Sequence, residues 1–316
     1  SNPKGGESLP GAAESWEISN EGKKYTFFLN KNGKWSNGDP VTASDFVCSW
    51  KRILTPSLGS QYPDMLYYVT GAYEFHNEIN NNFDNVGVKA IDDFTLEVNL
   101  KNPTPFFLGL LSHYSTWPVH KETVLKYGDI DDRNGEWTRP GNFVCNGPFQ
   151  LKSWELNSKI IVDKNPFYWD SKKVKLNEIH FYPVQNTMTE DRMFRAGQLH
   201  LTSTLPSQKC PIYIEENNPN LRIDPYMGTY FYRFNTKHPV LKDVKVRKAL
   251  AYAINRTQLV EKVTKCGQIP AYSFTPPGSA GYQPDTEIKY DPLLAKQLLV
   301  EAGSSNPEDC PKLEIL

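Results

Sequence analysis

The sequence predicts a protein of the α/β or α+β class, in which helices and strands alternate along the chain. Three observations indicate it. Residues 88–100 and 147–162 each read as two alternating strands around a turn, which is typical of hairpins. Residues 243–254 place apolar side chains at helical spacing. Residues 176–202 read as strand, helix and strand, which predicts a β-α-β unit. The chain has 316 residues, enough for about two domains.

The first elements form a compact packing unit. Residues 25–29 predict a strand, and residues 36–40 have the Asn, Gly and Pro content of a tight turn. A helix is then expected at 42–53, with Thr42 as its cap and Asp45 adding negative charge to its first turn. Its apolar face consists of Phe46, Val47 and Trp50. We interpret this unit as scaffold, because it contains no catalytic group.

Further elements follow as far as residue 141. They are a helix at 71–78, the hairpin at 88–100, a short helix at 105–111 with Thr104 as its cap, and a helix at 121–127. Residues 129–141 are polar and contain Gly and Pro, so we expect a connection between subdomains there.

Helices and strands continue to alternate in the second half of the chain. The sequence there predicts the hairpin at 147–162, strands at 176–182 and 199–202 around a helix at 188–196, and extended runs at 222–226 and 229–235. Helices are expected at 243–254, 259–263 and 291–302, and a strand begins at Lys312.

Composition excludes several classes. The net charge of -1 gives no electrostatic basis for binding nucleic acid. No apolar run approaches the ~20 residues of a membrane span. The five cysteines are widely spaced and include no C-x-x-C pair, so neither a structural zinc site nor a thioredoxin-like motif is supported. Some could pair, and the spacing leaves open which; we expect Cys48 to be a buried free thiol.

No catalytic or cofactor motif is present. The six histidines are scattered, and no P-loop, G-x-G-x-x-G, G-x-S-x-G or H-E-x-x-H occurs. The acidic groups at 129–132 and 190–191 fit a solvated loop and a helix start better than acid–base catalysis. We therefore expect a protein that is not an enzyme and that holds no cofactor or metal.

The aromatic residues are suited to a ligand-binding cleft. They make up 13% of the chain, with 17 Tyr and 7 Trp. Tyr combines an apolar face with a hydroxyl, which suits a cleft that recognises a variable ligand. The run 226–232 has aromatics on both sides of Gly228 and could form such a cleft edge. It could equally be an ordinary pair of strands with alternating aromatics.

Several sequence blocks together carry a family likeness. The first comprises AESW at 13–16, YTFFL at 25–29 and the segment from KWSNG at 34–38 to Trp50. Four more blocks follow: GVKAIDD at 87–93, NGPF at 146–149, NPFYWD at 165–170 and DVKVRKAL at 243–250. In this order they resemble the peptide-binding proteins of ABC importers, the extracellular solute-binding proteins of family 5, and the likeness covers nearly the whole chain.

The resemblance implies a two-lobed periplasmic-binding-protein fold that closes on an extended peptide and delivers it to a permease. On that pattern, residues 1–137 form an inserted subdomain of lobe I, 138–228 the main part of lobe I, and 229–316 the start of lobe II. We expect truncation at both ends, and poor peptide binding by this chain alone. It also implies a monomer in the periplasm or anchored at the cell surface as a lipoprotein, with its export signal outside this chain.

The resemblance also implies ligand-binding residues. Tyr62 and Tyr226 fall where the family has cleft tyrosines. Phe231 falls where another tyrosine is usual, so a hydroxyl contact would be lost, and Gly228 and Thr229 belong to the same cleft-edge run. Gly228 stands where a member of the family has a disulfide cysteine, so that bridge is not expected.

Two more positions depart from the family, since Thr202 replaces a tyrosine and Thr264 a lysine. These departures leave the preferred peptide length open. They also leave open other ligands on the same scaffold, namely a murein peptide, haem or a nickel complex. A hydrolase is the remaining alternative.

Overall fold

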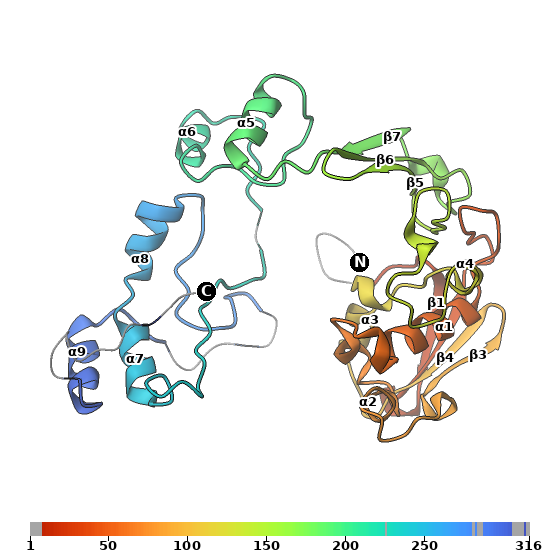
Figure 1. Cartoon of the computed structure of the whole chain (residues 1–316), viewed down its shortest axis with the longest axis horizontal. Helices are drawn as coiled ribbons and strands as arrows, with labels where there is room; N and C mark the ends of the chain where they lie inside the picture. The colour runs from red at the N-terminus through yellow and green to blue at the C-terminus, as the bar shows by residue number, and fades with distance from the viewer. Residues whose placement is uncertain (1–7, 225, 280–281, 283–286, 305–312, 314–316) are drawn as a thin grey trace. The chain divides into compact units, whose positions relative to one another are not determined.

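The structure is a computed structural model that describes residues 8–224, 226–279, 282, 287–304 and 313 (Figure 1). The chain divides into two compact units, Ser1–Pro183 and Val184–Leu316, and each is described by itself. This division reflects packing within the chain. The predicted domain boundaries at 137 and 228 stay predictions.

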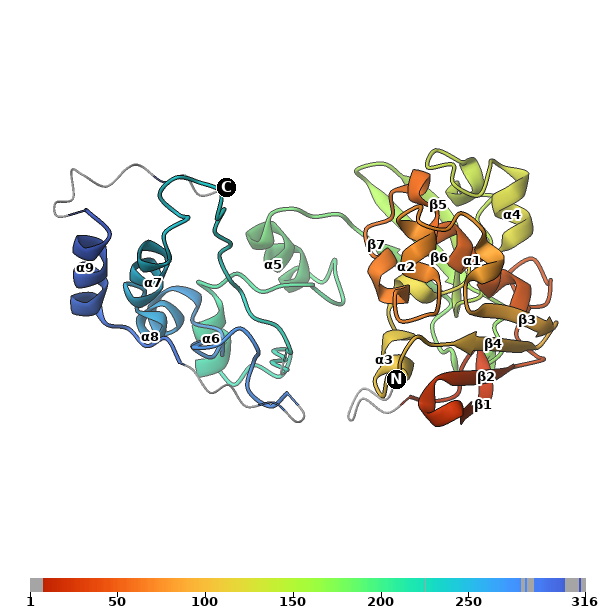
Figure 2. The same cartoon turned by 90° about the horizontal axis from the view of Figure 1, so that it is seen from below.

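The first unit contains a four-stranded antiparallel sheet in the order β1-β2-β4-β3 (Figure 2). Its strands are β1 (Ala13–Ser19), β2 (Lys24–Leu29), β3 (Val88–Asp92) and β4 (Thr95–Asn99). The predicted strand at 25–29 and hairpin at 88–100 are confirmed. β1 was predicted only as a block of family likeness, because its side chains are mostly exposed and do not alternate.

Helix α1 (Ala43–Leu54) packs against β3 and β4, as the sequence predicts for 42–53. The buried carboxylate of Asp45 fixes its start. It accepts hydrogen bonds from the backbone N–H of Thr42 at 2.9 Å and from the indole N–H of Trp35 at 3.2 Å. The first bond occupies a backbone donor at the helix N-terminus, where a negative charge is favourable, and the second ties this end of the helix to Trp35.

One hydrophobic core supports this sheet and helix. Fifteen buried residues form it: Tyr25, Phe27, Leu29, Ala43, Trp50, Leu54, Leu66, Val69, Ala72, Val86, Val88, Leu96, Val98, Leu100 and Phe107. Strands β2 and β4 contribute alternate residues, so one face of each strand is buried and the other is free to be polar.

Three short helices complete the covering of this core. They are α2 (Ala72–His76), α3 (Phe107–Leu110) and α4 (Lys121–Lys126), near the predicted positions. The prediction that Thr104 caps the helix at 105–111 is wrong. Its hydroxyl donates to the carbonyl of Asn102 at 3.0 Å, so the side chain is used in the preceding turn and the helix begins later.

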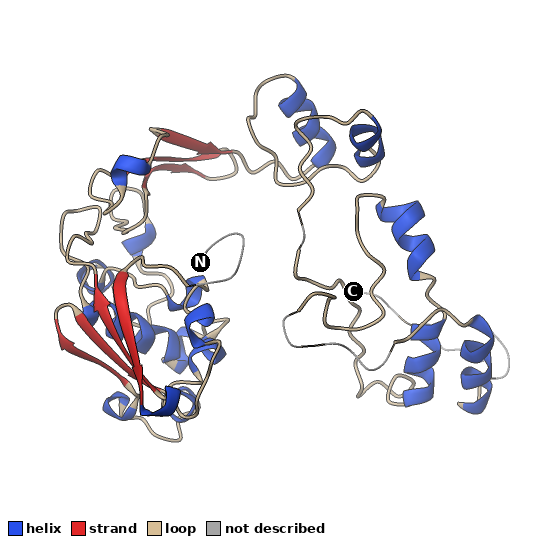
Figure 3. Ribbon diagram, turned by 180° about the vertical axis from the view of Figure 1, so that it is seen from behind, coloured by secondary structure: helices blue, strands red, loops and turns tan. Residues whose placement is uncertain are grey.

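A second antiparallel sheet in the first unit has the order β5-β6-β7 (Figure 3). Its strands are β5 (Phe149–Glu155), β6 (Lys159–Lys164) and β7 (Glu178–Phe181), which confirms the predicted hairpin and strand. Asn165 is fully buried at the end of β6 and donates to the carbonyl of Gly147 at 2.9 Å. This bond ties the end of the hairpin to its beginning.

The second unit is helical over its described residues, and no strand is assigned among them. Its helices are α5 (Thr187–Arg195), α6 (Cys210–Glu215), α7 (Val244–Tyr252), α8 (Arg256–Leu259), a π-helical turn at Val260–Thr264 and α9 (Pro292–Glu301). Helices α7 and α9 pack together, and Lys245 pairs with Glu301 at 3.2 Å. The predicted helices at 188–196, 243–254, 259–263 and 291–302 are confirmed, whereas α6 was not predicted.

The predicted strand at 199–202 does not form, so the β-α-β unit is wrong. The buried carboxylate of Glu190 accepts a hydrogen bond from the backbone N–H of Ser203 at 2.9 Å, which ties the end of this segment to α5. The runs at 222–226 and 229–235 are not paired into a sheet where they are described. The strand predicted from Lys312 lies outside the described residues, apart from the single residue Leu313.

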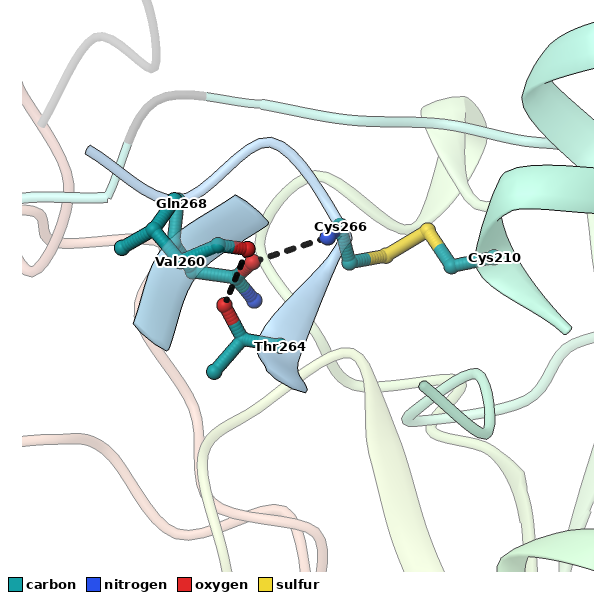
Figure 4. Close-up of a disulfide and its surroundings, with 5 residues drawn as sticks. All are labelled: Cys210, Val260, Thr264, Cys266 and Gln268. Carbon is teal, nitrogen blue, oxygen red and sulfur yellow. Dashed lines mark hydrogen bonds between the residues drawn. A yellow bond between two sulfur atoms is a disulfide. The ribbon is translucent and has the colours of Figure 1, made fainter. Parts of the chain in front are cut away.

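A disulfide joins Cys210 at the start of α6 to Cys266 after the π-helical turn (Figure 4). The two Cα atoms are 5.5 Å apart and the cysteines are 56 residues apart in sequence. Cys48 and Cys145 are free and half-buried, and burial raises the pKa of both thiols. The prediction of a free thiol at Cys48 is confirmed, whereas the residue is only half-buried.

Candidate ligand-binding site

Tyr62 lies just before the 3-10 turn Pro63–Leu66 of the first unit, and its side chain is 37% exposed. Its ring meets those of His113 and Tyr114 edge to face, with centroids 5.1 and 5.9 Å apart. Hydrogen bonding between the two phenols raises the pKa of the Tyr114 hydroxyl. Tyr62 is therefore part of an aromatic group at the surface rather than an isolated side chain.

A hollow of about 530 Å³ adjoins this group, and we call it the aromatic hollow. Its lining is mainly apolar and comes from the 3-10 turn Pro63–Leu66 and from residues 106–117. The lining residues are Met65, Phe106, Gly109, Leu110, Ser112, His113, Tyr114 and Trp117. Its volume lies within the range of small-molecule sites. Sequence reasoning missed it, although the density of aromatic residues in 106–117 was a signal.

The segment 226–231 contains the other predicted site residues, all in the second unit. Tyr226 is 88% exposed, and its carbonyl accepts a hydrogen bond from the backbone N–H of Gly228 at 3.0 Å. A Cβ atom at Gly228 would collide with the Tyr226 ring, so a side chain there would displace this tyrosine. Thr229 is half-buried, and Phe231 packs against Phe274 with ring centroids 4.9 Å apart.

The structure thus brings Tyr226, Gly228, Thr229 and Phe231 together on one segment. Tyr62 belongs to the first unit, where its ring packs against His113 and Tyr114, two residues that line the aromatic hollow. Of the two further departures, Thr264 donates its hydroxyl to the carbonyl of Val260 at 3.2 Å, within its own helical turn.

The described residues contain no group of three or more His, Cys, Asp or Glu side chains that could hold a metal ion. Within the same residues, none of the helices has the length and hydrophobicity that a bilayer span requires.

The sequence model of the bacterial extracellular solute-binding proteins, family 5, matches residues 7–314. The chain therefore belongs to this family of solute-binding proteins, whose members are not enzymes. The family likeness noted in the sequence blocks is confirmed.

Particular relatives are periplasmic peptide-binding proteins. The chain is 39% identical to the periplasmic oligopeptide-binding protein OppA of Escherichia coli over 94% of this chain and 55% of the relative. The structure of Haemophilus influenzae OppA in complex with RPPGFSPFR matches with a TM-score of 0.83 and 35% identity, over 93% of this chain and 58% of that one. The murein tripeptide-binding protein MppA of Escherichia coli matches with a TM-score of 0.83 and 33% identity, over the same shares.

These matches confirm the predicted fold class, the two-lobed solute-binding fold that mixes helices and sheets. The chain spans little more than half the length of the curated relatives it matches. The ligand-binding residues predicted above remain predictions, since none of these comparisons assigns a residue.

Proposed function

We propose that this chain is part of an extracytoplasmic solute-binding protein that captures peptides and delivers them to the permease of an ABC importer. The observation that carries the proposal is the 39% identity to a periplasmic oligopeptide-binding protein over 94% of the chain. The match to a relative in complex with a peptide supports the same ligand class.

The predicted residues have suitable chemistry for this ligand. Tyr62 and Tyr226 each offer an exposed ring face for apolar contact and a hydroxyl for a polar one. Gly228 leaves room for the Tyr226 ring beside the backbone, so it helps to set the position of that tyrosine. Thr229 adds a hydroxyl, whereas Phe231 supplies only an apolar ring.

The disulfide supports a location outside the cytoplasm. Disulfides persist in oxidising compartments such as the periplasm and the cell surface, and are rare where thiols are kept reduced. The bond between Cys210 and Cys266 therefore agrees with the periplasmic location in the relatives' names. We propose a monomer that is periplasmic or anchored at the surface as a lipoprotein.

Calorimetry of the full-length protein with a mixed peptide library tests the proposal. We expect saturable binding, and weakening of about tenfold in Tyr62→Ala, which removes an aromatic contact and a hydroxyl. Tyr73→Ala is the matched control, because Tyr73 is an exposed tyrosine of the same unit outside the site. Tight binding of a sugar or metal chelate with no binding of any peptide would sink the proposal.

A murein peptide is the second candidate ligand. The match to the murein tripeptide-binding protein favours it, and so do the tyrosines replaced by Phe231 and Thr202. Native mass spectrometry of ligand carried through purification separates the two candidates. It would also reveal haem or a nickel complex.

A further inference from the structure

The aromatic hollow has large side chains at its rim that nothing in the first unit covers. Trp117 and Tyr114 are each 59% exposed, and Phe106 is 54% exposed. Exposed apolar side chains are common singly, but a cluster around a concavity is typical of a binding surface. The hollow is thus a candidate for a contact outside the unit's own core.

Hydrogen bonds of Thr116 hold the segment that carries the rings of Tyr114 and Trp117. Thr116 is buried, and its hydroxyl is within hydrogen-bond distance of the carbonyls of Leu111 and His113 at 3.0 and 2.9 Å. Its own carbonyl accepts a hydrogen bond from the indole N–H of Trp50 in the core, at 2.9 Å. The backbone between Tyr114 and Trp117 is therefore anchored to the core while both rings remain at the surface. Such an arrangement lowers the entropic cost of binding.

The neighbouring histidine is also held in place. The Nδ1 atom of His113 lies 2.8 Å from the hydroxyl of Ser115 and accepts a hydrogen bond from the Ser115 backbone N–H at 3.3 Å. Its ring stacks on Tyr114 at 4.3 Å between centroids and meets Tyr62 at 5.1 Å. Tyr62, which we propose contacts the ligand, therefore lies beside His113 and Tyr114 at the edge of the aromatic hollow.

The chemistry of the lining selects among possible occupants. The residues that line the hollow include no Asp, Glu, Lys or Arg. A charged group entering it would lose hydration without gaining a counter-charge, which is unfavourable. A large apolar or aromatic group would gain contact with several ring faces and edges.

We propose that the aromatic hollow accepts one large apolar or aromatic side chain of the bound peptide, with Tyr114 and Trp117 as specificity-determining residues. The inference rests on the proposed function, because the occupant is part of the peptide that Tyr62 would contact. It adds a preference for one class of side chain at one position of the peptide.

The test uses the full-length protein and tetra-alanine, together with the four tetrapeptides in which one alanine is replaced by tryptophan. Calorimetry is expected to find one position at which tryptophan strengthens binding about tenfold. Trp117→Ala should remove most of that gain, so that this variant binds tetra-alanine and the tryptophan peptide with affinities within about threefold of each other. Trp117→Phe should keep most of it, and Trp154→Ala, which changes an exposed tryptophan on β5, should keep all of it.

Two outcomes would overturn the inference while the proposed function stands. In the first, tetra-alanine binds but tryptophan strengthens binding at no position. In the second, Trp117→Ala weakens every peptide alike, which indicates a structural role. Binding of no peptide at all would instead overturn the proposed function, and the inference with it.

Discussion

The two units of the chain differ in what stabilises each of them internally. The first unit buries fifteen residues in one cluster around a sheet and α1. Among the described residues of the second unit, the buried apolar side chains are only Cys210, Val246, Ala249, Ala295 and Pro206. The second unit instead has a disulfide, and it leaves Tyr226 and Tyr230 88% and 89% exposed.

The difference teaches that an apolar sequence pattern produces burial only where another element covers it. Strand β2 and the run 229–235 both contain closely spaced aromatic residues. The first is paired on both sides and turns one face to the core that also holds Trp50 of α1, so Tyr25 and Phe27 are buried. The second has no strand beside it among the described residues, so Tyr230 and Tyr232 stay largely exposed, while Phe231 packs against Phe274. Side chains left uncovered in this way are available to a ligand.

The largest expected effect concerns the core of the first unit. Trp50→Ala should lower its free energy of unfolding by about 5 kcal/mol, since it removes a buried indole and the hydrogen bond to Thr116. Urea unfolding followed by hydrogen exchange of peptides from each unit measures it. Trp154→Ala is the control and should have little effect. If both units lose protection together, they unfold as one and the comparison fails.

The disulfide should matter almost as much, and only to the second unit. Replacing both Cys210 and Cys266 by Ser should lower that unit's free energy of unfolding by about 4 kcal/mol, because a loop of 56 residues is no longer closed in the unfolded chain. The same exchange measurement applies, with Cys48→Ser as control. Unchanged protection of α6 in the double variant would contradict the assigned role.

The smallest effect is a dependence on pH in the first unit. Lys24 pairs with Glu97 at 2.7 Å across β2 and β4, and hydrogen bonding to Lys24 lowers the pKa of Glu97 below its ordinary value of 4.5. Because the carboxyl pKa is lower in the folded state, the ion pair stabilises the fold fully at pH values above 4.5. This stabilisation is lost as the pH falls through the pKa of Glu97 in the folded state. Because the pair is partly exposed, Glu97→Gln should cost at most about 1 kcal/mol at pH 7.

Thermal unfolding between pH 2 and pH 7 checks this prediction. The difference between wild type and Glu97→Gln should shrink as the pH falls below about 4.5. Glu17→Gln, on an exposed position of β1, should show no such trend. A difference that stays constant over the whole range would rule out the ion pair as its source.

The fold could be predicted where local signals decide it. Thr42, Asp45 and the apolar spacing that follows were enough to predict α1. The strand predicted at 199–202 is wrong because its alternating pattern does not reveal a tertiary contact. The backbone N–H of Ser203 donates a hydrogen bond to the carboxylate of Glu190, 13 residues earlier in the chain. β1 forms because β2 pairs with it, and its own side chains show no strand alternation.

The site could be predicted only in part. The resemblance identified Tyr62, but neither helical nor strand spacing relates it to His113 and Tyr114, which packing between loops brings beside it. The pairing of Cys210 with Cys266 likewise depends on where α6 and the π-helical turn meet. Spacing left all pairings open, because five cysteines so far apart have no preferred partner in sequence.

That pairing also bears on how the chain acquires its disulfide correctly. Cys48 and Cys145 precede Cys210 and Cys266, so a chain emerging from its N-terminus presents two competing thiols first. Burial in the folded first unit raises the pKa of both, which depletes the thiolate that attacks disulfides. If the first unit folds before the second, mispairing with Cys48 and Cys145 is slowed, and disulfide formation is favoured among the cysteines of the second unit, which are Cys210, Cys266 and Cys310.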